Sequence, residues 1–235
     1  FDENAMNDVI SNFMLPDVTI NANIQEAEYK NWNEEWEEAG FERININDSI
    51  TIYDARHDDG NGIASGISIG IETKQAFGTG THETTRMIVS TLLNIDLKGK
   101  RVLDCGCGTG ILGIAASKLG ASEVVGYDID EWSSENAIHN AELNGVGNMK
   151  VMLGDASVLK SVEGKFDVVL ANINRNILLA DMPAFVSVMA DDSLLILSGF
   201  YASDVDLLIE KASSLGLSKI DSKSDSEWTC LVLKK

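Results

Sequence analysis

The stretch VLDCGCGTG, residues 102–110, decides which fold the chain can form. An apolar run ends in Asp104, and glycines then occupy alternate positions at Gly106, Gly108 and Gly110. Glycine lets a chain turn sharply and brings bare backbone against a ligand, where a Cβ atom would obstruct the approach. The stretch therefore predicts a buried strand, a tight turn shaped by glycine, and a helix whose free N–H groups face an anionic group of the ligand.

Two cysteines inside this stretch offer a different interpretation, a metal or redox site. Cys105 and Cys107 are separated by one residue and have no second cysteine pair, and the nearest histidines, His82 and His139, lie in other segments. A structural zinc site normally has two paired clusters, and three cysteines are too few to staple 235 residues. We therefore expect no metal and interpret both cysteines as small fillers of the turn. Cys230 alternates with apolar residues and is expected in a buried strand.

From Lys100 to the end of the chain, segments typical of strands alternate with segments typical of helices. Helices are expected at residues 109–120, 132–145, 177–190 and 204–216, and strands at residues 100–106, 122–130, 149–156, 166–173, 193–200, 218–225 and 227–235. This alternation predicts an α/β fold, a doubly wound and mostly parallel sheet of seven strands with helices on both faces. The last two strands are joined by a short connection, so they must pair antiparallel at one edge of the sheet.

The first part of the chain is expected to form two further units. Residues 1–23 contain a short helix and one strand, which cannot cover each other's apolar faces, and the chain begins without methionine. We expect them to be the remnant of an N-terminal domain whose first part lies upstream. Residues 24–72 are expected to form a linker, a helix in which Trp32 and Trp36 share one face for packing, followed by short strands at RINI, SITIYD and GISIGIE. The main domain then covers residues 73–235.

The charge of the chain limits its partners. Its 37 acidic and 18 basic residues give a net charge of −19, and residues 1–59 hold 15 of the acidic and 3 of the basic side chains. Nucleic-acid binding draws most of its affinity from clustered lysine and arginine, so a basic protein is the better partner. The apolar runs are too short to cross a bilayer and the acidic start is unlike a secretion signal, so we expect no membrane association and a cytoplasmic location.

Polar side chains follow four of the predicted strands, and they are Asp104, Asp128, Asp155 and Asn172. Ligands of such sheets bind beyond the carboxyl ends of the strands, so we expect these side chains to line a nucleoside-binding crevice. Asp128 follows Gly106 by 22 residues, the position from which a carboxylate accepts hydrogen bonds from both hydroxyls of a ribose. The glycines fit a second ligand as well, because GTGILG from Gly108 matches the dinucleotide fingerprint G-x-G-x-x-G. A nicotinamide-dependent oxidoreductase therefore stays open.

The order of these motifs resembles the class I methyltransferases that use S-adenosylmethionine. VLDCGCGTG, VVGYDID, LGDA and FDVVLANI carry this likeness over residues 100–235. KNWNEEWE, AFGTGTHETTR, ANI and the closing EWTCLVLKK further resemble the ribosomal protein L11 methyltransferase family over nearly the whole chain. AFGTGTHETTR is the distinctive motif, because methyltransferases in general lack it. The family has a complete ferredoxin-like substrate-binding domain at its N-terminus, and only the later part of it is expected here, up to about Asn23.

The resemblance implies roles for residues of the expected site. Asp128 would contact the ribose, Asp155 would lie near the adenine, and Asn172 would lie near the methyl group that is transferred. Further cofactor contacts are implied for Thr85, Gly106 and Gly108, and for a loop that closes over the cofactor and comprises Phe77, Thr79, Thr81 and His82. His82 fits a position at the start of a helix equally well. Asp104 is expected either to order the glycine turn or to contact the amino group of the cofactor.

The reaction that the resemblance implies is transfer of methyl groups to lysine side chains or to the N-terminal amine of ribosomal protein L11. A lysine amine has a reference pKa near ~10.4, so it must lose a proton before it attacks. We hypothesise that the side-chain oxygen of Asn172 accepts a hydrogen bond from the amine and aims its lone pair at the methyl group. Methylation of another protein or of a nucleic acid, and a cofactor-binding module without turnover, are the other hypotheses.

Two segments depart from the family pattern. ETKQ, residues 72–75, replaces a proline and a glycine before AFGTG, and NRNI, residues 174–177, replaces an alanine and a proline after ANI. Both lie next to the expected site, so the family pattern does not determine the shape of the loops on the substrate side. The sequence also leaves open which amines are methylated, how many times, and whether the chain self-associates.

Overall fold

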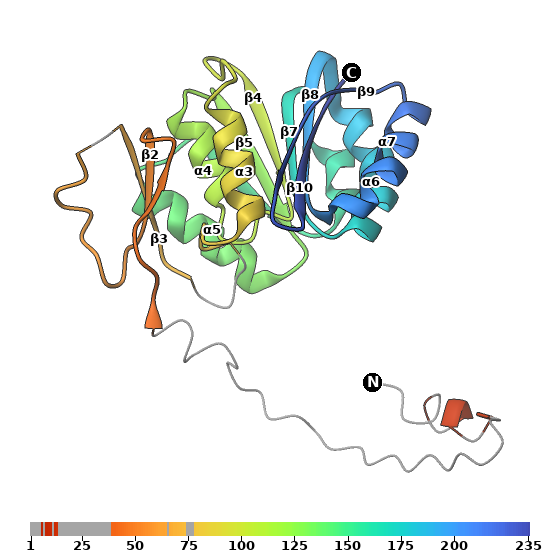
Figure 1. The fold of residues 1–235 in the computed structure, drawn as a ribbon, viewed down its shortest axis with the longest axis horizontal. Coiled ribbons are helices and arrows are strands. Elements are labelled where there is room, and N and C mark those ends of the chain that lie inside the picture. Colours follow the sequence, from red (N-terminus) through yellow and green to blue (C-terminus); the bar gives the residue numbers. More distant parts are fainter. Residues whose placement is uncertain (1–5, 7, 11, 14–38, 65, 74–77) are drawn as a thin grey trace. The chain divides into compact units, whose positions relative to one another are not determined.

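The computed structural model describes residues 6, 8–10, 12–13, 39–64, 66–73 and 78–235 (Figure 1). The chain divides into two units, residues 1–32 and residues 33–235. In the first unit, Met6 and residues 8–10 are helical, which agrees with the short helix expected there. The strand predicted after this helix, most of the helix expected around Trp32 and Trp36, and the rest of the expected ferredoxin-like remnant lie outside the described residues.

The larger of two sheets has seven strands in the order β6-β5-β4-β7-β8-β10-β9. Its strands are β4 (Arg101–Cys105), β5 (Glu123–Asp128), β6 (Met149–Leu153), β7 (Phe166–Asn172), β8 (Met189–Tyr201), β9 (Ser218–Asp225) and β10 (Trp228–Lys234). Neighbouring strands are parallel, except that β10 runs antiparallel to both β8 and β9. The predicted doubly wound, mostly parallel sheet is confirmed. The antiparallel pair at its edge is confirmed too, and β10 lies between β8 and the outermost strand β9.

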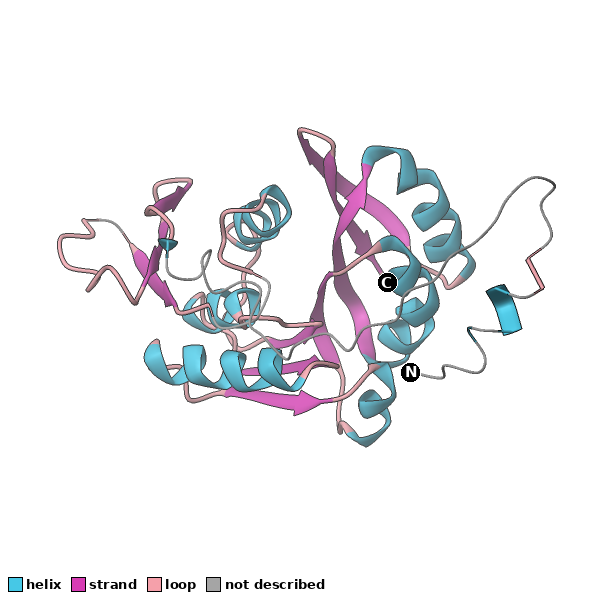
Figure 2. Ribbon diagram, turned by 90° about the horizontal axis from the view of Figure 1, so that it is seen from below, coloured by secondary structure: helices cyan, strands magenta, loops and turns pink. Residues whose placement is uncertain are grey.

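Helices cover both faces of this sheet (Figure 2). They are α3 (Glu83–Leu92), α4 (Ile111–Lys118), α5 (Glu131–Leu143), α6 (Arg175–Val188) and α7 (Val205–Ser214). Alternate residues of a strand point to opposite faces, so Val102 of β4 packs in one core with α3 and α4, and Leu103 packs in another with α6 and α7. Every helix in the described part of the chain is too short or too polar to span a bilayer.

A smaller sheet shares the first of these cores. It has the order β1-β2-β3 and comprises β1 (Ile44–Ile46), β2 (Ile50–Asp54) and β3 (Ile67–Ile71), with β1 antiparallel and β3 parallel to β2. Ile52 of β2 and Ile69 of β3 are fully buried in the cluster that also holds Ile88 of α3 and Ile114 of α4. The short strands expected before residue 73 are therefore confirmed, and they pack as part of the main unit.

Asparagines of α5 hold the free edge of β3. Asn144 accepts a hydrogen bond from the Gly70 N–H (3.0 Å) and donates one to the Gly70 carbonyl (2.7 Å). One turn earlier, Asn140 accepts from the Glu72 N–H (2.9 Å) and donates to the Glu72 carbonyl (3.1 Å). Asn136, a further turn back, also donates to the Glu72 carbonyl, at 2.9 Å. Side chains four residues apart share a helix face, so these asparagines take the place of a neighbouring strand.

Asn140 also links the small sheet to the glycine turn. Its side chain is fully buried and donates a further hydrogen bond to the carbonyl of Thr109, at 3.0 Å. One amide group therefore connects the end of β3, the helix α5 and the turn between β4 and α4. The position of the small sheet is thereby coupled to the shape of the turn.

We expect Asn140→Ala to lower the free energy of unfolding by about 1–3 kcal/mol, because it leaves the buried Glu72 N–H and Thr109 carbonyl without their side-chain partner. Glu142→Ala, on an exposed position of the same helix, is the matched control and should stay within about 0.5 kcal/mol of the original chain. Urea denaturation followed by circular dichroism measures both. Equal unfolding midpoints for the two variants would contradict this role of Asn140.

Candidate active site

The turn after β4 leaves no room for side chains at two of its glycines. Gly106 and Gly110 have φ of 65° and 79°, in the left-handed region that residues with a Cβ atom rarely adopt. A Cβ atom on Gly106 would lie 2.5 Å from Cγ2 of Ile173, and one on Gly110 would lie 3.1 Å from Cα of Ala137. The predicted turn is confirmed. Bare backbone therefore faces the carboxyl ends of the strands.

The cysteines of the turn are buried. Cys105 is fully buried and Cys107 nearly so, and burial raises the pKa of both thiols. Cys107 also donates its backbone N–H to the carbonyl of Tyr127, at 3.0 Å. Cys230 is fully buried in β10, as expected. All three thiols are therefore buried inside the fold.

Asp128, at the end of β5, is bound to the turn. One carboxylate oxygen accepts the N–H of Gly108 at 2.9 Å, and the other accepts the N–H of Asp130 at 3.1 Å. Both bonds fix the position of the carboxylate next to the turn. Asp128 is half-buried and lines a cavity. The ribose contact expected of Asp128 stays a prediction.

Asp104 lies behind the turn. Its side chain is 1% exposed, and one oxygen accepts the N–H of Gly113 in the first turn of α4, at 2.9 Å. The other oxygen has no hydrogen-bond partner. Burial raises the pKa of this carboxyl to about 7, and the charge of Asp128 adds to the shift. Of the two roles considered for Asp104, the geometry favours ordering the turn.

A cavity of about 340 Å³ opens at the carboxyl ends of β4, β5 and β7. Five predicted site residues line it, namely Gly106, Gly108, Asp128, Asp155 and Asn172. Asp155 accepts the N–H of Ser157 at 2.9 Å and begins the short 3-10 helix Ala156–Ser161. Hydrogen bonds from Ser157 lower the pKa of this exposed carboxyl.

Nine further lining residues were not predicted as site residues, and they include Tyr127, Ile129, Ile177 and Asp181. Ile129 is 77% exposed and Ile177 is 44% exposed, so the cavity lining contains two exposed apolar side chains. The Tyr127 side chain is 4% exposed, and burial raises the pKa of its hydroxyl. Burial and the nearby charge of Asp155 raise the pKa of Asp181. Among them, only Ile177 and Asp181 could have been found from the sequence. They are four residues apart, so a helix close to Asn172 would carry an apolar and an acidic side chain on one face.

The loop before α3 is attached to the glycine turn. Thr109, which is fully buried, donates its hydroxyl to the carbonyl of Gly78 at 2.5 Å. A Cβ atom on Gly78 would lie 2.9 Å from that same hydroxyl oxygen. Thr79 and Thr81 bind each other through their hydroxyls at 2.6 Å, and neither is among the described residues that line the cavity. Phe77 lies outside the described residues.

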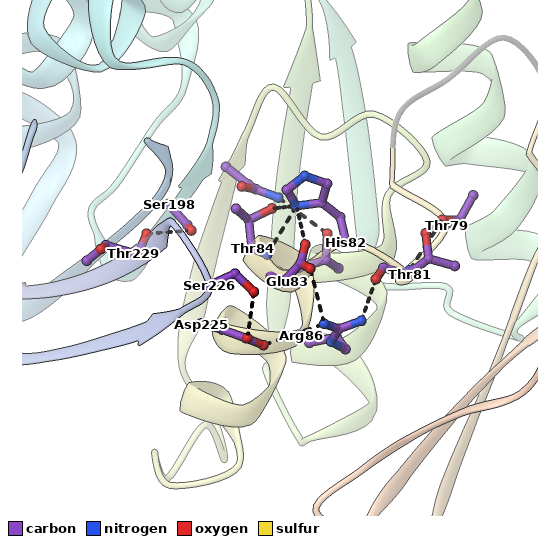
Figure 3. A network of polar contacts seen from close by, with 12 residues as sticks. Thr79, Thr81, His82, Glu83, Thr84, Arg86, Ser198, Asp225, Ser226 and Thr229 are labelled. Carbon is purple, nitrogen blue, oxygen red and sulfur yellow. Dashed lines mark hydrogen bonds and ion pairs between the residues drawn. The ribbon is translucent and has the colours of Figure 1, made fainter. Parts of the chain in front are cut away.

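The start of α3 brings Thr85 to Asn172. His82 precedes the helix, and its Nδ1 accepts the N–H of Thr84 at 3.3 Å, as the helix-start interpretation expects (Figure 3). Thr85, fully buried one position further on, accepts a hydrogen bond from the Asn172 side-chain nitrogen at 3.4 Å. The side-chain oxygen of Asn172 is buried and has no hydrogen-bond partner. It is therefore an acceptor that a bound donor would satisfy.

The segment after Asn172 that departs from the family pattern, residues 174–177, caps the start of α6. Asn174 accepts the N–H groups of Asn176 (3.1 Å) and Ile177 (3.2 Å) at the start of α6. A residue in this position satisfies backbone donors that the helix itself leaves free. The replaced segment thus sets the direction in which α6 leaves the cavity.

The strand order, the single reversed strand, the glycine turn and the carboxylate after the next strand define a class I methyltransferase. The ribosomal protein L11 methylase of Lactobacillus delbrueckii subsp. bulgaricus superposes with a TM-score of 0.73 at 29% identity, over 82% of this chain and 98% of its own. The magnesium protoporphyrin IX methyltransferase of Synechocystis has a TM-score of 0.53 at 25% identity, over 63% and 76%.

The sequence narrows the class further. The family model for ribosomal protein L11 methyltransferase (PrmA) matches residues 2–235. The protein named ribosomal protein L11 methyltransferase in Phocaeicola vulgatus is 47% identical over 231 residues, which cover 98% of this chain and 81% of that protein. The one in Bacteroides thetaiotaomicron is 44% identical over 230 residues, with the same coverage. The chain belongs to the ribosomal protein L11 methyltransferase family, which decides against the nicotinamide-dependent oxidoreductase.

Asp104→Asn keeps an acceptor for the Gly113 N–H and removes the titration. The folded pKa of about 7 exceeds the reference value of about 3.9, so the folded state binds an extra proton between these values. Stability therefore falls as the pH rises through this window. We expect the free energy of unfolding of Asp104→Asn, minus that of the original chain, to rise by about 1.4 kcal/mol per pH unit in this window. Urea denaturation between about pH 5 and pH 7 measures it, and a constant difference would contradict the burial argument.

Proposed function

We propose that this chain transfers methyl groups from S-adenosylmethionine to amino groups of ribosomal protein L11, on lysine side chains, on the N-terminal amine or on both. The observation that carries the proposal is the side chain of Asn172. It lies in the lining of the cavity, Thr85 holds its nitrogen, and its oxygen is buried without a partner. An incoming amine N–H is the donor that this oxygen needs.

The residues that line the cavity fit S-adenosylmethionine, which supplies a methyl group activated on a sulfonium when it is bound. Gly106 and Gly108 line the cavity, where backbone without a Cβ atom admits a close approach of the ligand. Asp128 offers carboxylate oxygens to the ribose hydroxyls. Ile129 and Ile177 offer apolar surface to a flat base.

The end of the cavity formed by β6 and α6 fits the exocyclic amine of an adenine. Asp155 and Asp181 both line it and accept hydrogen bonds there. These groups suit a base with an amino group better than one with a carbonyl in its place.

Asn172 would orient the amine that is methylated. An amide oxygen accepts a hydrogen bond without adding charge, whereas a carboxylate in this position would favour the protonated ammonium. Removal of water from the amine also favours its neutral form, which alone has a lone pair. The chain therefore contributes mainly position and a neutral acceptor, and holding reacting groups in place accounts for large rate gains.

The proposed partner agrees with the charge of the chain. A net charge of −19 attracts a lysine-rich polypeptide and speeds the encounter, and it disfavours direct binding of nucleic acid. The acidic side chains concentrated in residues 1–59 would add to this attraction. A ribosomal protein as substrate supports a cytoplasmic location for the proposed reaction.

Intact-mass spectrometry of purified ribosomal protein L11, incubated with the chain and S-adenosylmethionine, tests the proposal. We expect mass gains in methyl steps, and a decrease of about 100-fold in kcat for Asn172→Ala, because the amine loses its positioning group. Asn176→Ala, an exposed asparagine that contacts Arg175, is the matched control and should retain activity. Normal turnover by Asn172→Ala with unchanged cofactor affinity would contradict the role of Asn172.

The same incubation separates the other hypotheses. Ribosomal RNA serves as a second acceptor, and protection against thermal unfolding by S-adenosylhomocysteine reports cofactor binding. Protection without methylation of any acceptor would indicate a binding module. Methylation of the RNA alone would indicate a nucleic-acid methyltransferase.

A further inference from the structure

An aromatic pair lies where β8 ends and β10 begins. Tyr201 and Trp228 are opposite each other in the register of the two strands, and their ring centroids are 4.5 Å apart at an angle of 31°. The ring of His82 contacts Trp228 in an edge arrangement, with centroids 4.9 Å apart at 71°. The Trp228 ring therefore contacts both the Tyr201 ring and the His82 ring. Tyr201 is 47% exposed.

A hollow of about 400 Å³ adjoins this pair and is lined by Tyr201, Ala202, Ser203 and Glu227. The backbone carbonyl of Glu227 accepts the N–H of Ala202 at 3.1 Å, which fixes the floor of the hollow. We call it the Tyr201–Glu227 hollow. Its lining residues include one aromatic and one acidic residue.

Glu227 differs from the acidic residues around it. Asp225 and Glu83 both approach the guanidinium of Arg86, at 3.5 Å and 3.8 Å (Figure 3). Glu227 is exposed and makes no ion pair with any residue that the structure describes. The hollow therefore combines an aromatic ring with an unneutralised negative charge.

The Tyr201–Glu227 hollow lies close to Asn172. Asn172 of β7 is opposite Ser198 of β8, and Tyr201 follows three residues later, roughly 10 Å along the strand at about 3.3 Å per residue. The start of α3 makes a second connection, because His82 contacts Trp228 and Thr85 contacts Asn172. A polypeptide that brings an amine to Asn172 would pass the hollow within a few residues.

We propose that the Tyr201–Glu227 hollow binds a lysine or arginine side chain of the substrate polypeptide, next to the amine that is methylated. The inference rests on the proposed function and adds a docking position to it. A cation is attracted to the face of an aromatic ring and to a carboxylate. The aliphatic stem of a long basic side chain also packs well on a ring. An anionic group would meet Glu227 and the net charge of −19.

Binding of fluorescently labelled ribosomal protein L11, in the presence of S-adenosylhomocysteine, tests the docking position without turnover. We expect Glu227→Gln to raise the Kd about two- to fivefold, since the hollow is exposed to solvent. Glu163→Gln makes the same change of charge in the exposed loop before β7, at the end of that strand remote from Asn172. It should leave the Kd unchanged. Equal Kd values for the two variants would overturn the inference.

Two further measurements separate a docking effect from other causes. Tyr201→Leu should raise the Kd by a similar factor, and the effect of Glu227→Gln should decrease at high salt because the contact is ionic. Affinity for S-adenosylhomocysteine should be the same in all variants. If the original chain binds L11 but transfers no methyl group, the proposed function is wrong. The Kd values of the variants still test the docking position in that case.

Discussion

A turn between β4 and α4, with no room for a side chain at Gly106 or Gly110, is the constraint on which the site depends. The segments around it are bound to it by single hydrogen bonds, from the Gly108 N–H to Asp128, from the Thr109 hydroxyl to Gly78, and from Asn140 to the Thr109 carbonyl. These contacts come from β5, from the loop before α3 and from α5. A change in the turn would therefore move the Asp128 carboxylate, the loop and the small sheet together.

The carboxylates and the neutral amide of the site lie in different places. Asp104 is buried behind the turn, where it binds α4, and the other carboxylates lie in the cavity lining at Asp128, Asp155 and Asp181. At the end of β7 the polar group is the neutral amide of Asn172. A neutral acceptor is suited to a reaction that needs an uncharged amine, because it orients the nitrogen without stabilising the ammonium. Negative charge farther away, as at Glu227, can then attract a basic substrate without protonating the reacting group.

Much of the fold and part of the site could be predicted from local patterns. The seven strands, the glycine turn and the placement of Asp128 and Asn172 follow from the alternation of elements and from the rule that ligands bind at the carboxyl ends of strands. The small sheet was expected only as a linker, because its packing depends on Asn140 and Asn144, about seventy residues away in the sequence. Ile177 and Asp181 belong to the cavity through the direction of α6, which Asn174 sets.

A crystal structure with S-adenosylhomocysteine bound tests the central claim, that the glycine turn and its attached segments form one cofactor site ending at Asn172. The account predicts ribose hydroxyls on the Asp128 carboxylate, the adenine between Ile129 and Ile177 with its amine toward Asp155 and Asp181, and the sulfur directed toward Asn172. A ligand that lay outside this cavity, or that bound with its sulfur at the Asp155 end, would contradict it.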